Sequence, residues 1–370
     1  MKVMTIFGTR PEAIKMAPLV KELESRDNIE SIVCVTAQHR EMLDQVLDTF
    51  NIKPSYDLNI MKSNQSLSQI SMNIMKGLDK VIKEVKPDLI LVHGDTTTTF
   101  ISSLVAFYNQ VKVGHVEAGL RTYNKYSPFP EELNRQLTSV IADIHFAPTE
   151  KSKENLIKEG KDPKTIYITG NTAIDALKIT IDKEYKSEIT DKIGKNRMIL
   201  LTCHRRENLG DNMKNIFKVV NKISMEFDDV EIVYPIHLNP QIRDLVKEEF
   251  KGNKKVHIID PLSVVEFHNL LNKSYLILTD SGGIQEEAPS LGKPVLVLRK
   301  TTERPEGIKA KTLKLVGTNE DDIYKYTKEL LTNKKLYNEM SKASNPYGDG
   351  LASKYIVDAI EKNYIKIKSK

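Results

Sequence analysis

Acidic side chains lie on both sides of a stiff, proline-containing segment in the middle of the chain. The segment VGHVEAGLRTYNKYSPFPEELNR, residues 113–135, begins as an apolar strand, ends that strand at Glu117 and later presents Glu131 and Glu132. Strand capping and the acidic start of a helix explain each of these acids separately, as helix capping explains Asp95 in HGDTTTTF. If the acids meet in one site, they become candidate acid and base groups, because neighbouring carboxylates repel and acquire different pKa values.

Cationic side chains follow the first apolar run of the chain. GTRPEAIK, residues 8–15, offers Arg10 and, about one helical turn beyond it, Lys15. A guanidinium and an ammonium at the start of a helix suit a phosphate or diphosphate, although ordinary surface charge is the alternative. The segment is not G-x-G-x-x-G, and the second apolar run ends in Thr36-Ala37-Gln38, which has no acid for a ribose. This pattern argues against nicotinamide binding in the first half of the chain.

A glycine turn after a later apolar run gives a second phosphate signal. In LILTDSGGIQEEAPSLG, residues 276–292, the apolar run ends at Asp280 and the letters SGG open a helix. Glycines let the backbone approach a phosphate closely, and the serine can cap the helix, bind the phosphate, or do both. An acid one turn later can accept both hydroxyls of a ribose, and a plain glycine turn with a capped helix is the alternative. The residues in question are Ser281, Gly282, Gly283, Glu286 and Glu287.

Two histidines also follow apolar runs. His204 lies in LLTCHRREN beside Arg205, and His237 lies in VYPIHLNP. Each can carry a proton or donate to a phosphate near neutral pH, or can be a packed or capping imidazole. No His, Cys or Asp spacing matches a metal site, and no G-x-S-x-G nucleophile motif occurs, so we predict neither a metal nor a serine nucleophile.

These candidates must be positioned by strands, because short apolar runs alternate with helical patterns along the whole chain. The runs in the first half are residues 1–8, 31–37, 88–94, 111–118, 144–149 and 166–171. The runs in the second half are residues 197–204, 230–237, 255–260, 274–280 and 293–299. The βαβα order predicts an α/β protein with parallel sheets covered by helices. We therefore expect two Rossmann-like, doubly wound domains, residues 1–170 and 171–349, that face a central cleft with the ligand beyond the carboxyl ends of the strands.

The bulk composition narrows the class of protein. The 370 residues are 40% hydrophobic and 28% charged with a formal net charge of +5, and the positive charge forms no concentrated stripe. We therefore expect no nucleic-acid partner, although the mild positive balance suits an anionic substrate. No run approaches the roughly 20 apolar residues that span a bilayer, and the chain does not begin as a secretory signal. Cys34 and Cys203 lie far apart in apolar runs, which predicts reduced thiols and a cytoplasmic location.

Long motifs in a fixed order resemble the non-hydrolysing UDP-N-acetylglucosamine 2-epimerases. The motifs are FGTRPEAIKMAPL, TAQHREML, HGDTTTTF, GHVEAGLRT, PFPEELNR, TCHRREN and TDSGGIQEEAP, and they run from residue 6 to about residue 307. The resemblance implies the two-domain fold of the glycosyltransferase B type. It also implies a final helix, within residues 350–370, that packs back on the N-terminal domain.

By that resemblance the chain interconverts UDP-N-acetylglucosamine (UDP-GlcNAc) and UDP-N-acetylmannosamine (UDP-ManNAc), which supplies mannosamine-type sugars for surface polysaccharides. The resemblance implies no cofactor, no required metal and a homodimer. UDP leaves C1, an oxocarbenium-like centre makes the C2 proton acidic, and a base removes it to give 2-acetamidoglucal. The proton then returns to the opposite face and UDP adds back, which requires acid/base groups on two faces of the sugar and a diphosphate clamp.

The same resemblance places functional roles on individual residues. The catalytic groups of the family fall on Asp95, Glu117, Glu131 and His204. Nucleotide and phosphate contacts fall on Arg10, Lys15, Ser281, Gly282, Gly283, Glu287 and Arg304. Phe267 and Leu262 fall beside the uracil, and Arg205 and His237 near the sugar or the closing elements. Which acid serves which face of the sugar stays open.

One segment departs from the pattern of some family members, which bind a second UDP-GlcNAc as an activator. Gln38 is present, but Glu41 and Asn64 stand where those members carry Gln and Arg. The loss of a cation weakens the prediction of such a site.

Three alternatives stay open at this point. They are a hydrolysing 2-epimerase that releases ManNAc and UDP, a glycosyltransferase of the same fold, and a nucleotide-sugar binding protein without turnover.

Overall fold

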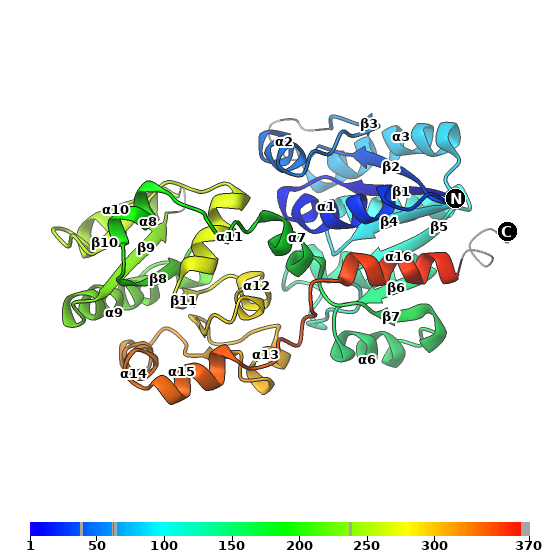
Figure 1. The fold of residues 1–370 in the computed structure, drawn as a ribbon. Coiled ribbons are helices and arrows are strands. Elements are labelled where there is room, and N and C mark those ends of the chain that lie inside the picture. Colours follow the sequence, from blue (N-terminus) through cyan, green and yellow to red (C-terminus); the bar gives the residue numbers. More distant parts are fainter. Residues whose placement is uncertain (38–39, 61, 63–64, 237–238, 364–370) are drawn as a thin grey trace. The chain divides into compact units, whose positions relative to one another are not determined.

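The computed structural model of the chain divides into two compact units (Figure 1). It describes residues 1–370 apart from 38–39, 61, 63–64, 237–238 and 364–370. Unit 1 comprises Met1–Ile179 and Tyr347–Lys370, and unit 2 comprises Thr180–Pro346. The predicted domain bounds, 1–170 and 171–349, stay a prediction.

The first sheet, as built by the described residues, has seven strands in the order β3-β2-β1-β4-β5-β6-β7, and its pairings are parallel. The strands are β1 (Lys2–Phe7), β2 (Glu30–Val35), β3 (Tyr56–Asp57), β4 (Leu89–His93), β5 (Lys112–Val116), β6 (Ile144–Ala147) and β7 (Ile166–Ile168). The strand order reverses between β1 and β4, since β2 and β3 follow β1 on one side and the later strands follow on the other. Such a switch point leaves a crevice at the carboxyl edge of a doubly wound sheet.

Helices connect these parallel strands, and one more follows the last strand. They are α1 (Arg10–Glu24), α2 (Arg40–Thr49), α3 (Leu67–Val85), α4 (Thr97–Tyr108), α5 (Glu131–Ile141), α6 (Glu150–Lys158) and α7 (Thr172–Thr180), with a 3-10 turn η1 (Pro163–Thr165) before β7. After the chain leaves unit 2, the last helix α16 (Ala352–Lys362) lies beside α1 (Figure 1).

Unit 2 repeats this architecture with a six-stranded parallel sheet in the order β10-β9-β8-β11-β12-β13, again counted over the residues that are described. The strands are β8 (Arg197–Thr202), β9 (Val230–Pro235), β10 (Val256–Ile259), β11 (Leu276–Thr279), β12 (Val295–Val297) and β13 (Leu313–Leu315). The switch point of this sheet lies between β8 and β11, the counterparts of β1 and β4.

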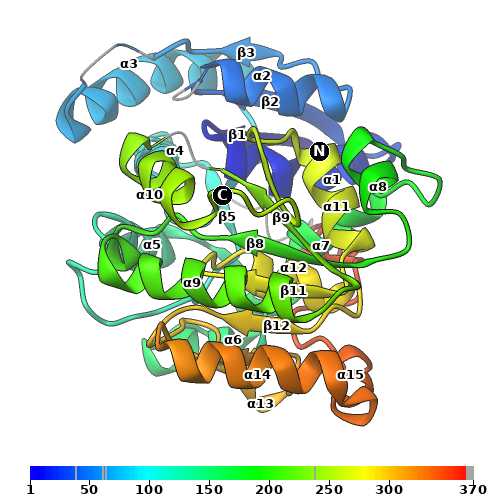
Figure 2. The same cartoon turned by 90° about the vertical axis from the view of Figure 1, so that its left-hand side faces the viewer.

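The helices of unit 2 cover its sheet. They are α8 (Glu188–Ile193), α9 (Asp211–Glu226), α10 (Pro240–Glu249), α11 (Val264–Lys273), α12 (Ile284–Ser290), α13 (Pro305–Lys309), α14 (Glu320–Thr332) and α15 (Lys334–Ser341), with a 3-10 turn η2 (Arg206–Asn208). Figure 2 shows α9 next to α10 and α14 within this unit, and α9 packs against both.

Apolar side chains explain why these segments form these elements. β4 is buried at every position, as expected for a parallel strand with helices on both faces, whose sequence reads as one apolar run rather than an alternation. In α3, Ile70, Ile74 and Leu78 are buried at four-residue spacing, so one stripe of the helix packs on the sheet. The predicted class, two doubly wound parallel-sheet units, is confirmed. No helix in the described part of the chain is long and apolar enough to cross a membrane.

The carboxylate of Asp175 anchors the start of α16. Asp175 on α7 accepts from the backbone N–H of Ala352 at 3.2 Å and of Ser353 at 2.7 Å. Burial raises the pKa of Asp175, and these hydrogen bonds oppose that rise. Further along α16, Arg26, which lies just after the end of α1, pairs with Asp358 at 2.8 Å and with Glu361 at 3.1 Å. The start of α16 is therefore held by a buried carboxylate of α7. Further along, two more exposed carboxylates of α16 itself bind Arg26.

We expect Asp175→Ala to lower the free energy of unfolding by about 2 kcal/mol, because two buried N–H donors lose their acceptor. The matched control is Asp358→Ala, which breaks an ion pair to Arg26 in which the acid is 45% exposed. Such a surface pair contributes less than about 1 kcal/mol. Urea unfolding of the intact chain measures both variants, and equal losses would contradict the anchoring role of Asp175.

Candidate active site

The sequence-predicted residues of unit 1 gather at the carboxyl edge of its sheet. Arg10 is the first residue of α1 and follows β1, while Asp95 follows β4 and Glu117 follows β5. β1, β4 and β5 are neighbours in the sheet, so the three turns lie side by side at the switch point. Burial lowers the pKa of the Arg10 guanidinium, which still leaves it cationic at neutral pH. Glu131, the first residue of α5, is partly buried.

A buried carboxylate ties the turn after β1 to the turn after β4. Glu12 is 2% exposed and accepts from the backbone N–H of Gly8 at 3.1 Å and of Thr9 at 2.8 Å. Its other oxygen accepts from the hydroxyl of Thr96 at 2.6 Å and from that of Thr99 at 3.3 Å. Burial raises the pKa of Glu12, and these donors oppose the rise. Glu12 therefore fixes the turn that carries Arg10 relative to the turn that carries Asp95.

The Glu117 carboxylate is surrounded by nitrogen atoms. One oxygen, Oε2, is bonded to the Lys15 ammonium, accepts from Asn171 Nδ2 at 2.9 Å and lies 3.7 Å from His93 Nε2. The Glu117 side chain is 9% exposed, and its backbone is left-handed with φ +63°. Burial lowers the pKa of His93 to about 4, so this imidazole is neutral at pH 7. The sequence assigned Lys15 to a phosphate, whereas here it is paired with the carboxylate.

Asp95 pairs with an arginine that the sequence analysis did not select. Its carboxylate is bonded to Arg135 of α5, and the amide of Asn134 donates to the Asp95 carbonyl at 2.9 Å. Arg135 also donates to Glu132 at 3.1 Å, and the buried Glu132 accepts from the backbone N–H of Thr122 at 3.0 Å. Glu132 therefore holds the segment before α5, while Asp95 and Arg135 form a charged pair. The cap of α4 is Thr96 rather than Asp95, so the capping interpretation of Asp95 is wrong.

In unit 2 a buried aspartate holds the turn that carries His204. Asp280 follows β11, is fully buried, and its Oδ2 accepts from the backbone N–H of His204 at 3.0 Å and of Arg205 at 2.9 Å. Asn208 donates to the same oxygen at 3.0 Å. The other oxygen, Oδ1, lies 3.6 Å from His204 Nδ1, and the imidazole is 44% exposed. Asp280 thus holds the backbone of the turn that carries a partly exposed histidine at the switch point of the second sheet.

The SGG turn corrects one prediction. Ser281 does not cap α12, because the helix begins at Ile284 with Gly283 in the capping position and without a side-chain cap bond. Instead the backbone N–H of Ser281 donates to the hydroxyl of Thr279 at 2.9 Å. A close contact explains why position 282 is a glycine: a methyl group there would lie only 2.9 Å from Arg304 Nη1. The guanidinium of Arg304 therefore packs over the glycine turn.

A second buried acid positions that arginine. Glu286 is 1% exposed and accepts from Arg304 Nε at 2.8 Å, so Arg304 is held against the turn after β11. The adjacent Glu287 lies with Oε2 4.0 Å from His268 Nε2. Phe267 on α11 and Leu262 in the segment before α11 are partly buried. The two neighbouring acids therefore have different partners. Glu286 binds Arg304, whereas Glu287 faces His268 of α11.

Several predicted residues lie outside the described part of the chain. They are His237 among the substrate-binding candidates, and Gln38 and Asn64, with the side chain of Glu41, among the activator-segment residues. In the ranges that are described, no three His, Cys, Asp or Glu side chains are grouped so as to hold a metal ion.

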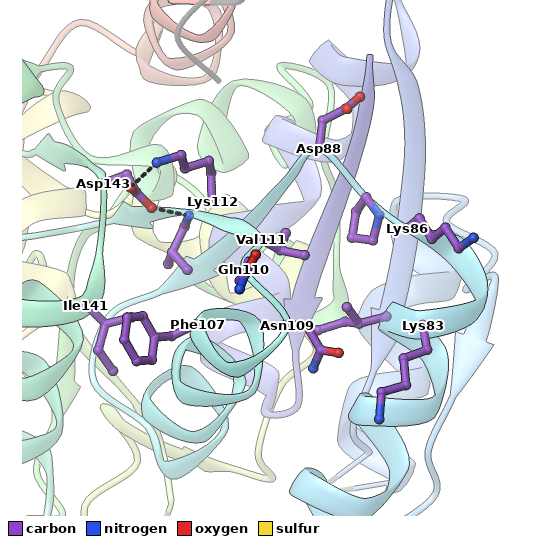
Figure 3. Close-up of a pocket in the computed structure, with 13 residues that line it drawn as sticks. Lys83, Lys86, Asp88, Phe107, Asn109, Gln110, Val111, Lys112, Ile141 and Asp143 are labelled. Carbon is purple, nitrogen blue, oxygen red and sulfur yellow. Dashed lines mark hydrogen bonds and ion pairs between the residues drawn. The ribbon is translucent and has the colours of Figure 1, made fainter. Parts of the chain in front are cut away.

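A cavity of about 650 Å³ in unit 1 lies at the opposite edge of the sheet (Figure 3). It is lined by Asp88, Lys112 and Val113 at the amino ends of β4 and β5, with Phe107, Ile141 and Asp143 from neighbouring segments. Lys112 and Asp143 form an ion pair at 3.0 Å within it. Because β4 and β5 run parallel, this cavity is separated by the length of the strands from Asp95 and Glu117 and lies apart from the candidate site.

Each unit places its predicted site residues at the switch point of its own doubly wound sheet, which is where α/β enzymes of the nucleotide-binding class hold their ligands. Comparisons with known proteins identify which enzyme family this is. The family model described as UDP-N-acetylglucosamine 2-epimerase matches residues 21–361. The UDP-N-acetylglucosamine 2-epimerase of Bacillus subtilis is 62% identical, over 98% of this chain and 96% of that protein.

Solved structures agree with this match. The co-structure of S. aureus MnaA with UDP has a TM-score of 0.92 at 56% identity, covering 100% of this chain and 98% of that one. UDP-GlcNAc 2-epimerase from Neisseria meningitidis bound to UDP-GlcNAc has a TM-score of 0.89 at 52% identity, covering 98% of this chain and 100% of that one. The chain belongs to the UDP-N-acetylglucosamine 2-epimerase family. The resemblance in its motifs and the predicted enzyme class, an isomerase, are confirmed, and the glycosyltransferase and binding-protein alternatives are not favoured.

Proposed function

We propose that the chain interconverts UDP-GlcNAc and UDP-ManNAc without releasing the free sugar. The C1–O bond to UDP breaks, the C2 proton passes to a protein base, and the C1–C2 double bond of 2-acetamidoglucal forms. Delivery of a proton to the opposite face of C2 and re-addition of UDP to C1 then give the epimer. The observation that carries this proposal is the placement of Asp95 and Glu117 after neighbouring strands at one switch point, in a chain of this family.

Unit 1 supplies the acid and base groups in this proposal. Asp95, Glu117 and Glu131 serve the two faces of C2, because proton removal and return on opposite faces need groups on both sides of the sugar. Asp95 is paired with Arg135 and Glu117 with Lys15, so each carboxylate lies against a cation. An ammonium has three N–H donors, so Lys15 can hold Glu117 and a phosphate oxygen together.

Unit 2 supplies the contacts to UDP. Arg304 and the turn Ser281-Gly282-Gly283 hold the diphosphate, because the guanidinium already packs over the turn and is a strong partner for phosphate oxygens. The Glu287 carboxylate accepts hydrogen bonds from the two ribose hydroxyls. Phe267 and Leu262 contact the uracil. His204, oriented by Asp280, donates to the departing diphosphate, which stabilises the charge that develops when the C1–O bond breaks. Arg10 of unit 1 adds a second guanidinium to these contacts, and Arg205 and His237 of unit 2 are assigned to the surroundings of the sugar.

The non-hydrolysing outcome depends on UDP and not water adding to the glucal. Both UDP and the intermediate must stay bound, and water must be excluded while they do.

We expect NMR of UDP-GlcNAc with the enzyme in deuterated water to show UDP-ManNAc formation and one deuterium at C2 of each epimer that has turned over. Both signals follow from exchange of the abstracted proton with solvent before its return. Free ManNAc with UDP as the main products would establish the hydrolysing alternative. Absence of deuterium at C2 while the epimer forms would contradict the elimination mechanism.

A further inference from the structure

The amide side chain of Asn171 reaches the candidate base from a distant segment of unit 1. Asn171 lies between β7 and α7, is 2% exposed, and its Nδ2 donates to Glu117 Oε2 at 2.9 Å. The two residues are 54 positions apart in the chain. A buried amide that donates to a carboxylate both orients it and favours its ionised form, because the N–H bond is stronger to a charged acceptor.

The rest of Asn171 is fixed by its own bonds. Its side-chain oxygen accepts from the backbone N–H of Ala173 at 2.9 Å, at the start of α7. Its backbone N–H donates to the carbonyl of Tyr347 at 2.7 Å, where the chain re-enters unit 1. The preceding residue, Gly170, has φ +83°, and a methyl group there would lie 3.1 Å from both Gly348 Cα and the Tyr347 carbonyl oxygen. The side-chain amide of Asn171 is therefore bonded at both its nitrogen and its oxygen, and its backbone is fixed against the segment at Tyr347.

The charged and titratable groups that face Glu117 come from other elements. Lys15 extends from α1 and His93 from the end of β4, and both lie on the same oxygen, Oε2, as Asn171. The second oxygen, Oε1, would lie 3.7 Å from a methyl group placed on Gly94, next to Asp95. Oε2 is thus the held oxygen, and Oε1 is directed toward the Asp95 turn.

We propose that Asn171 is a positioning residue for epimerisation, which holds Glu117 Oε2 so that Oε1 is presented to the C2 proton of the UDP-sugar. This inference rests on the proposed role of Glu117 as a base. Asn171 acts through Glu117 and touches no reacting atom itself.

A purely structural residue would change stability but leave the ionisation of Glu117 unaltered. If Asn171 donates to the ionised carboxylate, its loss raises the pKa of Glu117. Turnover needs the ionised base, so the acid limb of the pH profile of kcat/KM moves to higher pH. We expect a shift of about one pH unit for Asn171→Ser, whose hydroxyl can still cap α7 but cannot reach Glu117. Asn171→Asp keeps the cap and places an anionic oxygen against Oε2, so its shift should be larger.

Asn109 offers a matched control in the same unit. Its Nδ2 donates to the carboxylate of Asp79 at 3.0 Å, but beside the amino edge of the sheet. Asn109→Asp makes the same chemical change next to a carboxylate and should leave the acid limb where it is in the wild type. Thermal unfolding of each variant shows whether it is folded at the assay temperature.

The outcomes separate this inference from the proposed function. Acid limbs that rise in the order wild type, Asn171→Ser, Asn171→Asp support the positioning role. Unshifted limbs in both folded variants, with Glu117→Gln inactive, overturn the role of Asn171 alone. Near-normal turnover of Glu117→Gln overturns the proposed role of Glu117 instead.

Discussion

Glu117→Gln is expected to lower kcat for epimerisation by about 10³-fold, which is the scale of a missing general base. Glutamine has the shape of glutamate and can still accept from Lys15 and Asn171, so the site should stay assembled. The charge of Lys15, whose side chain is 15% exposed, loses its anionic partner, and we expect the free energy of unfolding to fall by no more than about 2 kcal/mol. Coupled turnover assays and urea unfolding measure the two quantities separately.

Asp143→Asn is the matched control for this prediction. Asp143 also pairs with a lysine, Lys112, at 3.0 Å, but at the amino edge of the same sheet. The control should therefore keep kcat within about two-fold of wild type, as a surface pair away from the chemistry contributes little. A Glu117→Gln variant that turns over as fast as Asp143→Asn would contradict the assignment of Glu117.

Asp95→Asn and Glu131→Gln extend the test to the two faces of the sugar. Each should also reduce turnover strongly while the fold stays intact. Deuterium wash-in started from UDP-GlcNAc reports the base on one face, and wash-in started from UDP-ManNAc reports the base on the other. A variant that blocks wash-in from one epimer more than from the other identifies the face on which its carboxylate works.

Much of the fold followed from the sequence because parallel strands buried on both faces leave unbroken apolar runs. The runs at 88–94 and 274–280 contain β4 and β11, and the polar letters after each run mark the carboxyl edge. That rule found Asp95 and Glu117 without any knowledge of tertiary contacts. β3 (Tyr56–Asp57) was not predicted, since a two-residue strand is too short to produce a periodic signal.

Residues that act across the chain were harder to find. Asn171 was part of a predicted strand end, yet an amide there has no chemical signature until Glu117 is seen beside it. Arg135 lies in the middle of α5, where arginine is ordinary on a helix surface. Lys15 was correctly noticed as a cation but its pairing with Glu117 joins residues 102 positions apart, which local spacing does not encode. Sequence patterns locate edges and turns, whereas the pairing of charges depends on tertiary structure.

Asp280→Ala is expected to have the second large effect, because it removes the acceptor that holds the His204 turn. Three donors, the backbone N–H groups of His204 and Arg205 and the amide of Asn208, would be left without that buried oxygen. We expect the free energy of unfolding to fall by about 3 kcal/mol and kcat to fall by about 10²-fold or more, as His204 loses its orientation. Urea unfolding and turnover assays on the same preparations measure both losses.

Asp280→Asn separates the two causes of that loss. Its side-chain oxygen can still accept from the three donors, so the turn should keep most of its stability, but the carboxylate 3.6 Å from His204 Nδ1 is gone. If the charge on Asp280 matters for catalysis, kcat falls in Asp280→Asn while the free energy of unfolding changes little. Asp229→Ala, which breaks the ion pair with Arg197 at the start of β8, is the control and should leave kcat unchanged. Wild-type kcat in Asp280→Asn would show that Asp280 only builds the turn, and that its charge does nothing for His204.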